Sequence, residues 1–533
     1  MKNAELILRK QFGKLPEQTY TAADLERIRY YHDTHQEKDP GIFTVDEITW
    51  NDLDMDAVFG VLNATQSSVG EDYLYHLLHC MDLTGDERFA ALTDYFLRNQ
   101  EERFKTQAKL HGLGKITTFS IARIIDLADD LIPEKNTKHI LLDICLLASI
   151  ALIFVYPGAG VLLTLIFLSM SVFSYFKKKS EIAPYFTTFF YIKRMLVAAK
   201  EILKINENEM KAEEEEISSI LKNSRSFARN TFFLAGGTQF SSNVFDIFLD
   251  YLRILFHLDI IKFNSMLGYL KTHREEIERL RAFLGKTDAA ISCASSKTAI
   301  AELTRPQFTD DRTIQVKDAF HLLLSDPVKN SIKADGGILI TGSNASGKST
   351  FIKSVAICAL LAQTIALVPA AFYRAARFRL LTSMALKDDI REGESYFIVE
   401  IRSLKRIVDL AKEDGAPVLC FVDEVLRGTN TVERIAASSR VLSSLNRLNA
   451  ITFAATHDIE LTNILRNGFR NVHFEETVTD NDVEFNYQLK DGPSTTRNAI
   501  RLLHVIGFDD EVIDQAEDAA KEFTQSNHWS VIS

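Results

Sequence analysis

The sequence predicts an α/β domain with a mostly parallel sheet and flanking helices in its C-terminal part, preceded by an all-helical domain. Two apolar runs typical of buried strands, at residues 337–341 and 418–422, support the α/β prediction, together with a helical spacing of apolar residues over 351–361. The helical domain is predicted because apolar residues recur every three or four positions over 52–131 and 186–284, with few glycines or prolines.

We expect three parts along the chain, because 533 residues are enough for several packed domains. They are an N-terminal segment of residues 1–49, the helical domain of residues 50–300 and the α/β domain of residues 301–533. The helical domain also carries an apolar hairpin at residues 140–176, which is discussed below.

A glycine-rich turn between the first predicted strand and helix has the composition of a complete phosphate-binding loop. It consists of Gly342, Ser343, Asn344, Ala345, Ser346, Gly347, Lys348, Ser349 and Thr350. Backbone N–H groups and the positive end of the helix dipole favour phosphate at such a helix start. In this arrangement Lys348 contacts the β- and γ-phosphates and the Ser349 hydroxyl binds Mg²⁺. The sequence therefore predicts ATP and Mg²⁺ as ligands, and the strand–loop–helix context favours this over a Gly/Ser loop without a nucleotide role.

Two carboxylates follow the second predicted strand directly. Asp423 is expected to hold the Mg²⁺ shell, whereas Glu424 lies on the other side of the pleat and is expected to act as the general base that polarises the attacking water. A third strand, at 451–455, brings His457 to the same edge, where it senses the γ-phosphate or orients water. On its own His457 is more typical of an ordinary surface or core histidine. Its position one strand after the acidic pair favours the catalytic interpretation, and the set predicts an ATPase.

The composition excludes several classes of protein. A net charge of −11 argues against a protein that coats nucleic acid through bulk electrostatics, although it is compatible with a local basic face. The five cysteines have no paired spacing, which argues against a disulfide framework or a zinc site and favours a reducing compartment. Residues 1–18 lack an apolar core of signal-peptide length, so we do not expect export.

Residues 140–176 carry Asp143 as their single formal charge and are interrupted by Pro-Gly-Ala-Gly at 157–160. Two arms of 17 and 16 residues would run about 26 and 24 Å, close to the bilayer core of about 30 Å, so we expect a transmembrane hairpin. Lys138 precedes the first arm and lysines 177–179 follow the second, which predicts two cytoplasmic flanks and an integral protein at the cytoplasmic face of the cell membrane. The alternative is a pair of buried helices in a soluble lever or a partner interface, which would place the protein in the cytoplasm.

Several of these motifs together resemble the MutS family of DNA mismatch-repair ATPases. They are the segment 54–77 with Leu-Asn-Ala-Thr-Gln-Ser-Ser-Val-Gly at 62–70, the phosphate loop, 361–363 with 368–370, 393–397, the acidic pair with 427–429, and Thr456-His457. The resemblance covers roughly residues 50–130 and 240–515, and this ordered set is more specific than a lone phosphate loop. It identifies the helical domain as the family's core and lever domain.

The resemblance implies a homodimer through the ATPase domains, in which Ser395 of one subunit completes the ATP site of the other. It also implies that Asn344 and Thr429 lie near the nucleotide and the dimer seam, and that duplex DNA is a partner. On its own, Ser395 has the pattern of a helix N-cap before an amphipathic run at 397–410, and the two roles are compatible because a helix start also favours anions.

The sequence also departs from the family. The residues before position 50 are too few for the family's mismatch-reading domain, and no separate DNA clamp is evident after residue 180. The segment 326–330 offers no aromatic ring to stack on adenine, and Leu322 follows His321 where proline is usual, so we expect base contacts from elsewhere.

Three functional hypotheses follow. We favour a membrane-tethered, MutS-like ATPase whose dimer closes around DNA. A transporter ATPase is disfavoured because the chain lacks a Leu-Ser-Gly-Gly-Gln signature. The remaining alternative is a membrane scaffold or signalling ATPase that no longer binds DNA.

Overall fold

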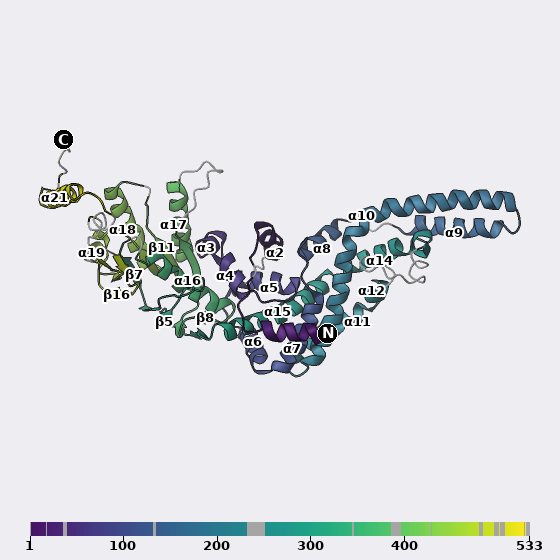
Figure 1. Ribbon diagram of the computed structural model, residues 1–533, viewed down its shortest axis with the longest axis horizontal. Helices are drawn as coiled ribbons and strands as arrows, with labels where there is room; N and C mark the ends of the chain where they lie inside the picture. The colour runs from purple at the N-terminus through teal and green to yellow at the C-terminus, as the bar shows by residue number, and fades with distance from the viewer. Residues whose placement is uncertain are drawn as a thin grey trace. The chain divides into compact units, whose positions relative to one another are not determined.

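The computed structural model of the chain (Figure 1) describes residues 2–17, 19–35, 40–131, 135–231, 251–343, 346–384, 396–427, 429–478, 483–494, 500, 507–526 and 528. Its contacts divide the chain into two compact units, and each unit is assembled from separate stretches of sequence. Unit 1 comprises Met1–Gln36, Leu62–His76 and Glu87–Ala299. Unit 2 comprises Glu37–Val61, Leu77–Asp86 and Ile300–Ser533.

Unit 1 is built from helices, as the apolar spacing predicted. Its long helices α10 and α15 pack against α6, α7 and α11 around a core that includes Phe189, Tyr191 and Leu284. The helices are α1 (Lys2–Gln11), α2 (Ala22–Thr34), α5 (Ser68–His79), α6 (Arg88–Arg98), α7 (Gln100–Leu113), α8 (Ile121–Asp130), α9 (Thr137–Leu152), α10 (Pro157–Ile205), α11 (Lys211–Asn223), α12 (Arg225–Asn230), α14 (Leu258–Thr272) and α15 (Arg274–Ala299).

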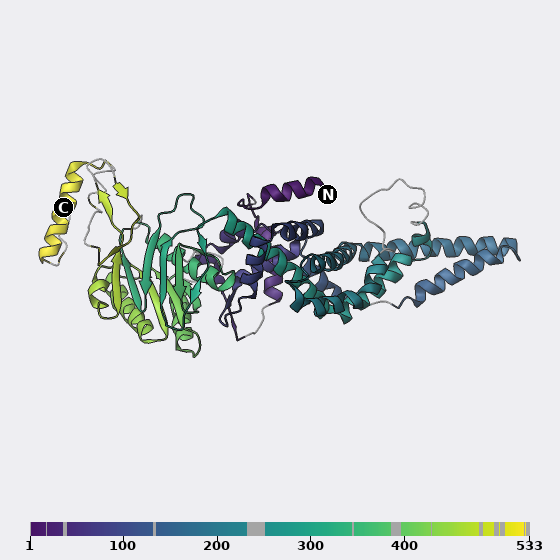
Figure 2. The ribbon, with the colours of Figure 1, turned by 90° about the horizontal axis from the view of Figure 1, so that it is seen from below.

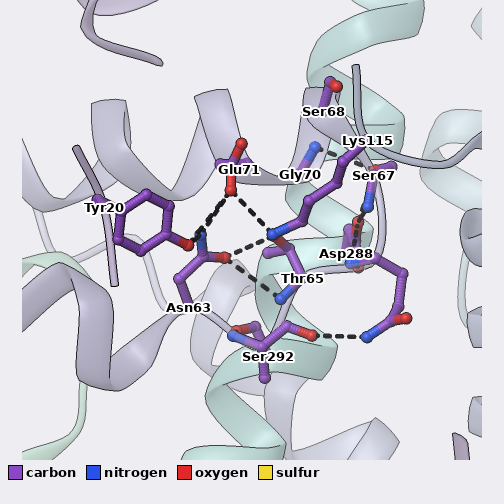
Figure 3. Close-up of polar contacts among 12 residues, drawn as sticks. Tyr20, Asn63, Thr65, Ser67, Ser68, Gly70, Glu71, Lys115, Asp288 and Ser292 are labelled. Atoms are coloured by element: carbon purple, nitrogen blue, oxygen red, sulfur yellow. Dashed lines mark hydrogen bonds and ion pairs between the residues drawn. The ribbon is translucent and has the colours of Figure 1, made fainter. Parts of the chain in front are cut away.

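A buried carboxylate on α15 holds the beginning of α5 (Figure 3). Asp288 accepts hydrogen bonds from the backbone N–H of Gln66 and from both the N–H and the hydroxyl of Ser67. A side chain at Gly70 would place its Cβ 2.2 Å from Asp288 Oδ2, so only glycine allows this approach. Burial raises the pKa of Asp288 to about 6. The glycine and serines of the 62–70 motif therefore serve helix packing in unit 1.

Glu71, one residue further along α5, is buried and surrounded by donors (Figure 3). Arg27 and Lys115 lie 2.9 and 2.8 Å from its carboxylate oxygens, and Asn63 donates a hydrogen bond to it at 3.1 Å. A buried carboxylate is strongly destabilising unless it is paired in this way. The network ties α2, the 62–70 motif and the segment after α7 to one point of unit 1.

Helices α9 and α10 form an antiparallel hairpin, with α9 lying along the first part of α10 in both views (Figures 1 and 2). Helix α9 ends at Leu152, and Pro157 occupies the first turn of α10, where its missing N–H costs nothing. Apolar side chains on the hairpin face outward: Phe154 is 87% exposed, Leu162 61% and Phe173 75%. Among the described residues of unit 1, none covers these side chains.

The hairpin differs from the predicted pair of short arms, because its second helix is much longer than the first. Among the described residues one helical stretch, Pro157–Ala183, is long and apolar enough to cross a membrane. Helix α9 has 16 residues and is too short to cross a membrane as a straight helix. Helix α10, in contrast, continues without a break through lysines 177–179 to Ile205. The sequence pattern located the turn but not the unequal lengths, because lysines 177–179 end the apolar run without ending the helix.

Unit 2 contains a six-stranded sheet with strand order β10-β11-β12-β7-β13-β16. The first five strands run parallel and β16 pairs antiparallel with β13, so the predicted mostly parallel α/β domain is confirmed. Strands β7, β10 and β12 are buried along their whole length, as expected for a sheet covered on both faces. The strands are β7 (Gly337–Thr341), β10 (Arg379–Ser383), β11 (Val418–Asp423), β12 (Ala450–Ala455), β13 (Phe469–His473) and β16 (Lys490–Asp491).

Helices and smaller sheets complete unit 2. The helices are α16 (Lys348–Thr364), α17 (Tyr396–Lys412), α18 (Thr431–Arg447), α19 (Glu460–Ile464) and α21 (Asp510–Ser526). A four-stranded sheet has the order β4-β9-β5-β6, with β4 (Gln307–Phe308), β5 (Ile314–Ala319), β6 (Asn330–Ala334) and β9 (Phe372–Ala375). Two-stranded pairs join β3 (Leu303–Thr304) to β8 (Val368–Pro369) and β14 (Glu476–Val478) to β15 (Val483–Phe485).

The predicted division at residue 50 differs from the observed one. Residues 37–61 and 77–86 belong to unit 2, where they form β1 (Ile42–Thr44), α3 (Glu47–Asp52), most of α4 (Met55–Leu62) and β2 (Cys80–Asp82). The carboxylate of Asp52 accepts hydrogen bonds from the Thr382 hydroxyl at 2.6 Å and from the backbone N–H of Met384 at 2.9 Å. Helical periodicity does not reveal which of two units a helix packs against, and these long-range contacts decide it.

Candidate active site

The phosphate loop connects β7 to α16. Gly342 and Gly347 have φ angles of +146° and +100°, which favour glycine, and a Cβ at Gly342 would lie 2.7 Å from Phe474 O and Ser346 Oγ. Lys348 folds back over the loop and donates hydrogen bonds to the carbonyl oxygens of Gly342 and Ser343, at 2.8 and 2.7 Å. Burial lowers the pKa of Lys348 to about 8. The predicted residues Asn344 and Ala345 lie outside the described residues.

The two predicted Mg²⁺ ligands lie together. The Ser349 hydroxyl, in the first turn of α16, donates a hydrogen bond of 2.5 Å to Asp423 Oδ2 at the end of β11. The second carboxylate oxygen, Oδ1, is buried and has no hydrogen-bond partner among the described residues. A hydroxyl and a carboxylate with a free lone pair are the oxygen ligands that Mg²⁺ prefers, so these residues fit the predicted metal.

Glu424 and His457 converge on the same point from neighbouring strands. His457 Nε2 lies 2.8 Å from Glu424 Oε1, and Arg427 Nη1 lies 3.0 Å from the other carboxylate oxygen. Lys348 Nζ is 3.4 Å from His457 Nε2, so the phosphate loop, the predicted base and the histidine form one continuous polar group. Because β11 and β12 are parallel neighbours, their carboxyl ends deliver these residues to one edge of the sheet.

Sequence reasoning did not identify Arg434, which fixes the segment that carries His457. Its guanidinium, on α18, makes two hydrogen bonds to the Asp458 carboxylate, at 2.9 and 2.5 Å. The backbone N–H of Asp458 donates to the Thr456 hydroxyl at 3.0 Å. The bidentate pair holds Asp458, and Asp458 in turn is bonded to Thr456, so both residues that flank His457 are held in place. The sequence carried no signal for the pairing beyond the charges themselves.

A cavity of about 440 Å³ opens beside the phosphate loop. It is bordered by the loop end and by the start of α16, by residues between Ala319 and Asn330, and by Tyr487. A Cβ at Gly347 would lie 3.1 Å from Tyr487 Cδ1, so the ring lies directly against the loop. Asn330 holds the backbone directly after this ring, because it donates to Tyr487 O at 2.9 Å and accepts from Leu489 N–H at 2.8 Å.

Tyr487 therefore brings to the phosphate loop an aromatic ring that the segment 326–330 lacks. Tyr487 is 43% exposed and its ring lies against Gly347, the residue before α16. No local sequence pattern indicates this position, since Tyr487 follows β15 and lies far along the chain from the loop. Its hydrogen-bond partner, Asn330, belongs to the segment 326–330.

The other predicted site residues lie away from Lys348, Glu424 and His457 or fall outside the described residues. The Thr429 hydroxyl bonds to Glu433 within its own helix start, at 3.2 Å, and the side chain of Thr350 is exposed. Ser395 lies outside the described residues. The structure therefore gathers Lys348, Ser349 and the residues at the ends of β11 and β12.

The chain is similar to known proteins over the region that contains this site. The family model of MutS domain V matches residues 338–524, a range that contains most of these residues. The chain is 29% identical to human MutS protein homolog 4 over 293 residues, which are 51% of this chain and 31% of that protein. It is also 29% identical to the DNA mismatch repair protein MutS of Staphylococcus haemolyticus over 284 residues, with coverage of 50% and 31%.

A third relative matches a shorter region. The DNA mismatch repair protein MutS 2 of Haloarcula marismortui is 36% identical over 187 residues, which are 34% of this chain and 19% of that protein. The matched regions therefore span about a third or less of the length of these relatives.

Proposed function

This chain is a member of the MutS family, and from that premise we propose that it binds and hydrolyses Mg²⁺–ATP as a dimer on DNA. The observation that carries the proposal is the convergence of Lys348, Asp423, Glu424 and His457 at one edge of a parallel sheet. A phosphate loop alone would support nucleotide binding. A carboxylate beside a histidine at the same point supports hydrolysis as well.

The geometry suggests how each residue contributes. Lys348 exchanges its contacts with the Gly342 and Ser343 carbonyls for the β- and γ-phosphate oxygens of ATP. Glu424 takes the proton of the attacking water, and His457, in contact with it, orients that water or the γ-phosphate. Ser349 and Asp423 would hold Mg²⁺, which would neutralise charge that develops on the phosphates. Tyr487 stacks on the adenine base.

The dimer is proposed through the ATPase domains. Ser395 of the second copy then approaches the γ-phosphate, as the family resemblance implies. Helix α17 begins one residue after this serine, so the start of a helix and its favourable dipole would face the triphosphate. We propose duplex DNA as the partner because two of the relatives are named DNA mismatch repair proteins.

We also propose that the α9–α10 hairpin tethers the protein to a membrane. The exposed apolar side chains of the α9–α10 hairpin and the 27-residue apolar stretch Pro157–Ala183 support it. Lysines on both sides of the hairpin favour the cytoplasmic face of the cell membrane. The same exposed hairpin, with the net charge of −11, favours the second candidate function, a membrane scaffold or signalling ATPase that does not bind DNA.

ATP turnover of the purified dimer, measured with and without DNA, distinguishes the two candidates. We expect homoduplex, mismatched or branched DNA to change the turnover rate and to retain the protein in a binding assay. Unchanged turnover with all three DNAs, together with no retention on any of them, would favour the scaffold.

A further inference from the structure

Glu400 is a buried carboxylate that belongs neither to the phosphate loop nor to the predicted metal ligands. It lies on α17 with 4% of its surface exposed, and its Oε1 accepts a hydrogen bond from the backbone N–H of Leu426. Burial raises the pKa of its carboxyl, and the neighbouring Glu424 adds to that rise. A buried carboxylate normally has a hydrogen-bond partner. Here the partner is a backbone N–H in the turn that follows β11.

That turn is strained. Glu424 and Leu426 have φ angles of +55° and +57°, and neither is glycine. Each such residue costs on the order of 1–3 kcal/mol, so the conformation persists only where the surroundings hold it. Two side chains from different helices do so: the Ser438 hydroxyl on α18 donates to Val425 O at 3.1 Å, and Glu400 accepts from Leu426 N–H.

Helix α17 is itself anchored at a second point within unit 2. Arg406 donates a hydrogen bond to the carbonyl oxygen of Thr382 at 2.5 Å and pairs with Asp46 at 2.7 Å. These contacts fix α17 against β10 and against the segment that begins α3. Glu400 therefore connects the turn carrying Glu424 to a helix whose position is set elsewhere in the unit.

We propose that Glu400 is a positioning residue for hydrolysis: its carboxylate oxygen holds the Leu426 N–H and thereby keeps Glu424 directed toward His457. The role rests on the proposed ATP hydrolysis and requires an acceptor atom at this point rather than a negative charge. Glutamine supplies that acceptor and alanine does not. Aspartate keeps the charge but is one methylene too short to reach.

The test compares Glu400→Ala and Glu400→Gln with the wild-type chain, with Lys405→Ala as a control on the exposed face of the same helix. We expect Glu400→Ala to lower kcat at least tenfold while the Kd for ATP stays within about threefold. Glu400→Gln is expected to restore kcat to within about threefold of wild type, and Lys405→Ala to match wild type. If Glu400→Ala does not fold, Glu400→Asp replaces it with the same expectation.

Hydrogen exchange of the Leu426 amide provides a readout that does not depend on turnover. We expect this amide to exchange at least tenfold faster in Glu400→Ala than in the wild type and in Glu400→Gln. Wild-type kcat and exchange in the alanine variant would overturn the proposal, as would equal losses in the alanine and glutamine variants. A wild-type chain without turnover, but with the expected exchange pattern, would refute hydrolysis and leave the anchoring role of Glu400 in place.

Discussion

His457 Nε2 lies 2.8 Å from Glu424 Oε1, although the two residues follow different strands. The contact exists because β11 and β12 are parallel neighbours whose register pairs Asp423 with Ala455, so the residues that follow both strands leave the sheet at the same edge. A carboxylate in this position is suited to accept a proton from water that the imidazole orients.

Replacing Glu424 with glutamine should abolish hydrolysis and preserve ATP binding. The amide keeps the size of the side chain but cannot accept the proton, and general bases typically contribute a factor of about 10²–10⁴. We expect kcat to fall at least about 100-fold with little change in Kd. Glu460→Gln, an exposed carboxylate at the start of α19, serves as the control. Turnover at the wild-type rate in Glu424→Gln would refute the assignment of the base.

Nucleotide affinity should depend on pH through Lys348. Its pKa is lowered from 10.5 to about 8, so the ammonium that contacts phosphate is present below pH 8 and is lost as the pH rises through that value. Only about a tenth of it is charged at pH 9, so the apparent Kd for ATP should be about tenfold weaker at pH 9 than at pH 7. Lys348→Ala should bind weakly at both values without this slope. Equal wild-type affinities at pH 7 and pH 9 would contradict the prediction.

Tyr487 should contribute to binding of the base and not of the phosphates. Stacking of a base on an aromatic ring is worth about 1–3 kcal/mol, so Tyr487→Ala should weaken ATP binding about tenfold. Tyr487→Phe keeps the ring and should remain within about twofold of wild type. Inorganic tripolyphosphate has no base, and its Kd should be the same in all three proteins. An equal loss of tripolyphosphate binding in Tyr487→Ala would instead indicate a damaged phosphate loop.

The hairpin should determine partitioning into membranes. One charged residue at the centre of a spanning helix costs about 2.5–3.5 kcal/mol of insertion, so Leu162→Lys combined with Phe173→Lys should move the protein to the soluble fraction. Deletion of residues 140–176 should have the same effect. Val197→Lys, an exposed position beyond the apolar stretch of the same helix, is the control and should leave partitioning unchanged. A wild-type chain found wholly in the soluble fraction would defeat the membrane proposal.

The sequence predicted the parts of the site that depend on local order. The phosphate loop is contiguous, and the residues at 423, 424 and 457 directly follow apolar strands. Since the carboxyl ends of parallel strands share one edge, their convergence could be expected before any coordinates were known.

The parts that depend on long-range packing could not be predicted. Tyr487 lies against the phosphate loop, and its carbonyl oxygen accepts a hydrogen bond from Asn330 of β6, 157 positions away in the sequence. The Asp52–Thr382 contact that joins residues 37–61 to unit 2 links positions 330 apart in the sequence. Helical periodicity gave the helices of unit 1 but not the length of α10, which continues past its apolar stretch as a charged helix.

Sedimentation of the Glu424→Gln chain with and without saturating Mg²⁺–ATP tests the central claim most directly, because this variant should hold ATP without consuming it. We expect a monomer, or a weak dimer, without nucleotide and a stable dimer with Mg²⁺–ATP, and we expect Lys348→Ala in the same background to abolish the shift. A chain that binds Mg²⁺–ATP and remains monomeric at saturation would contradict the claim that two copies share the site.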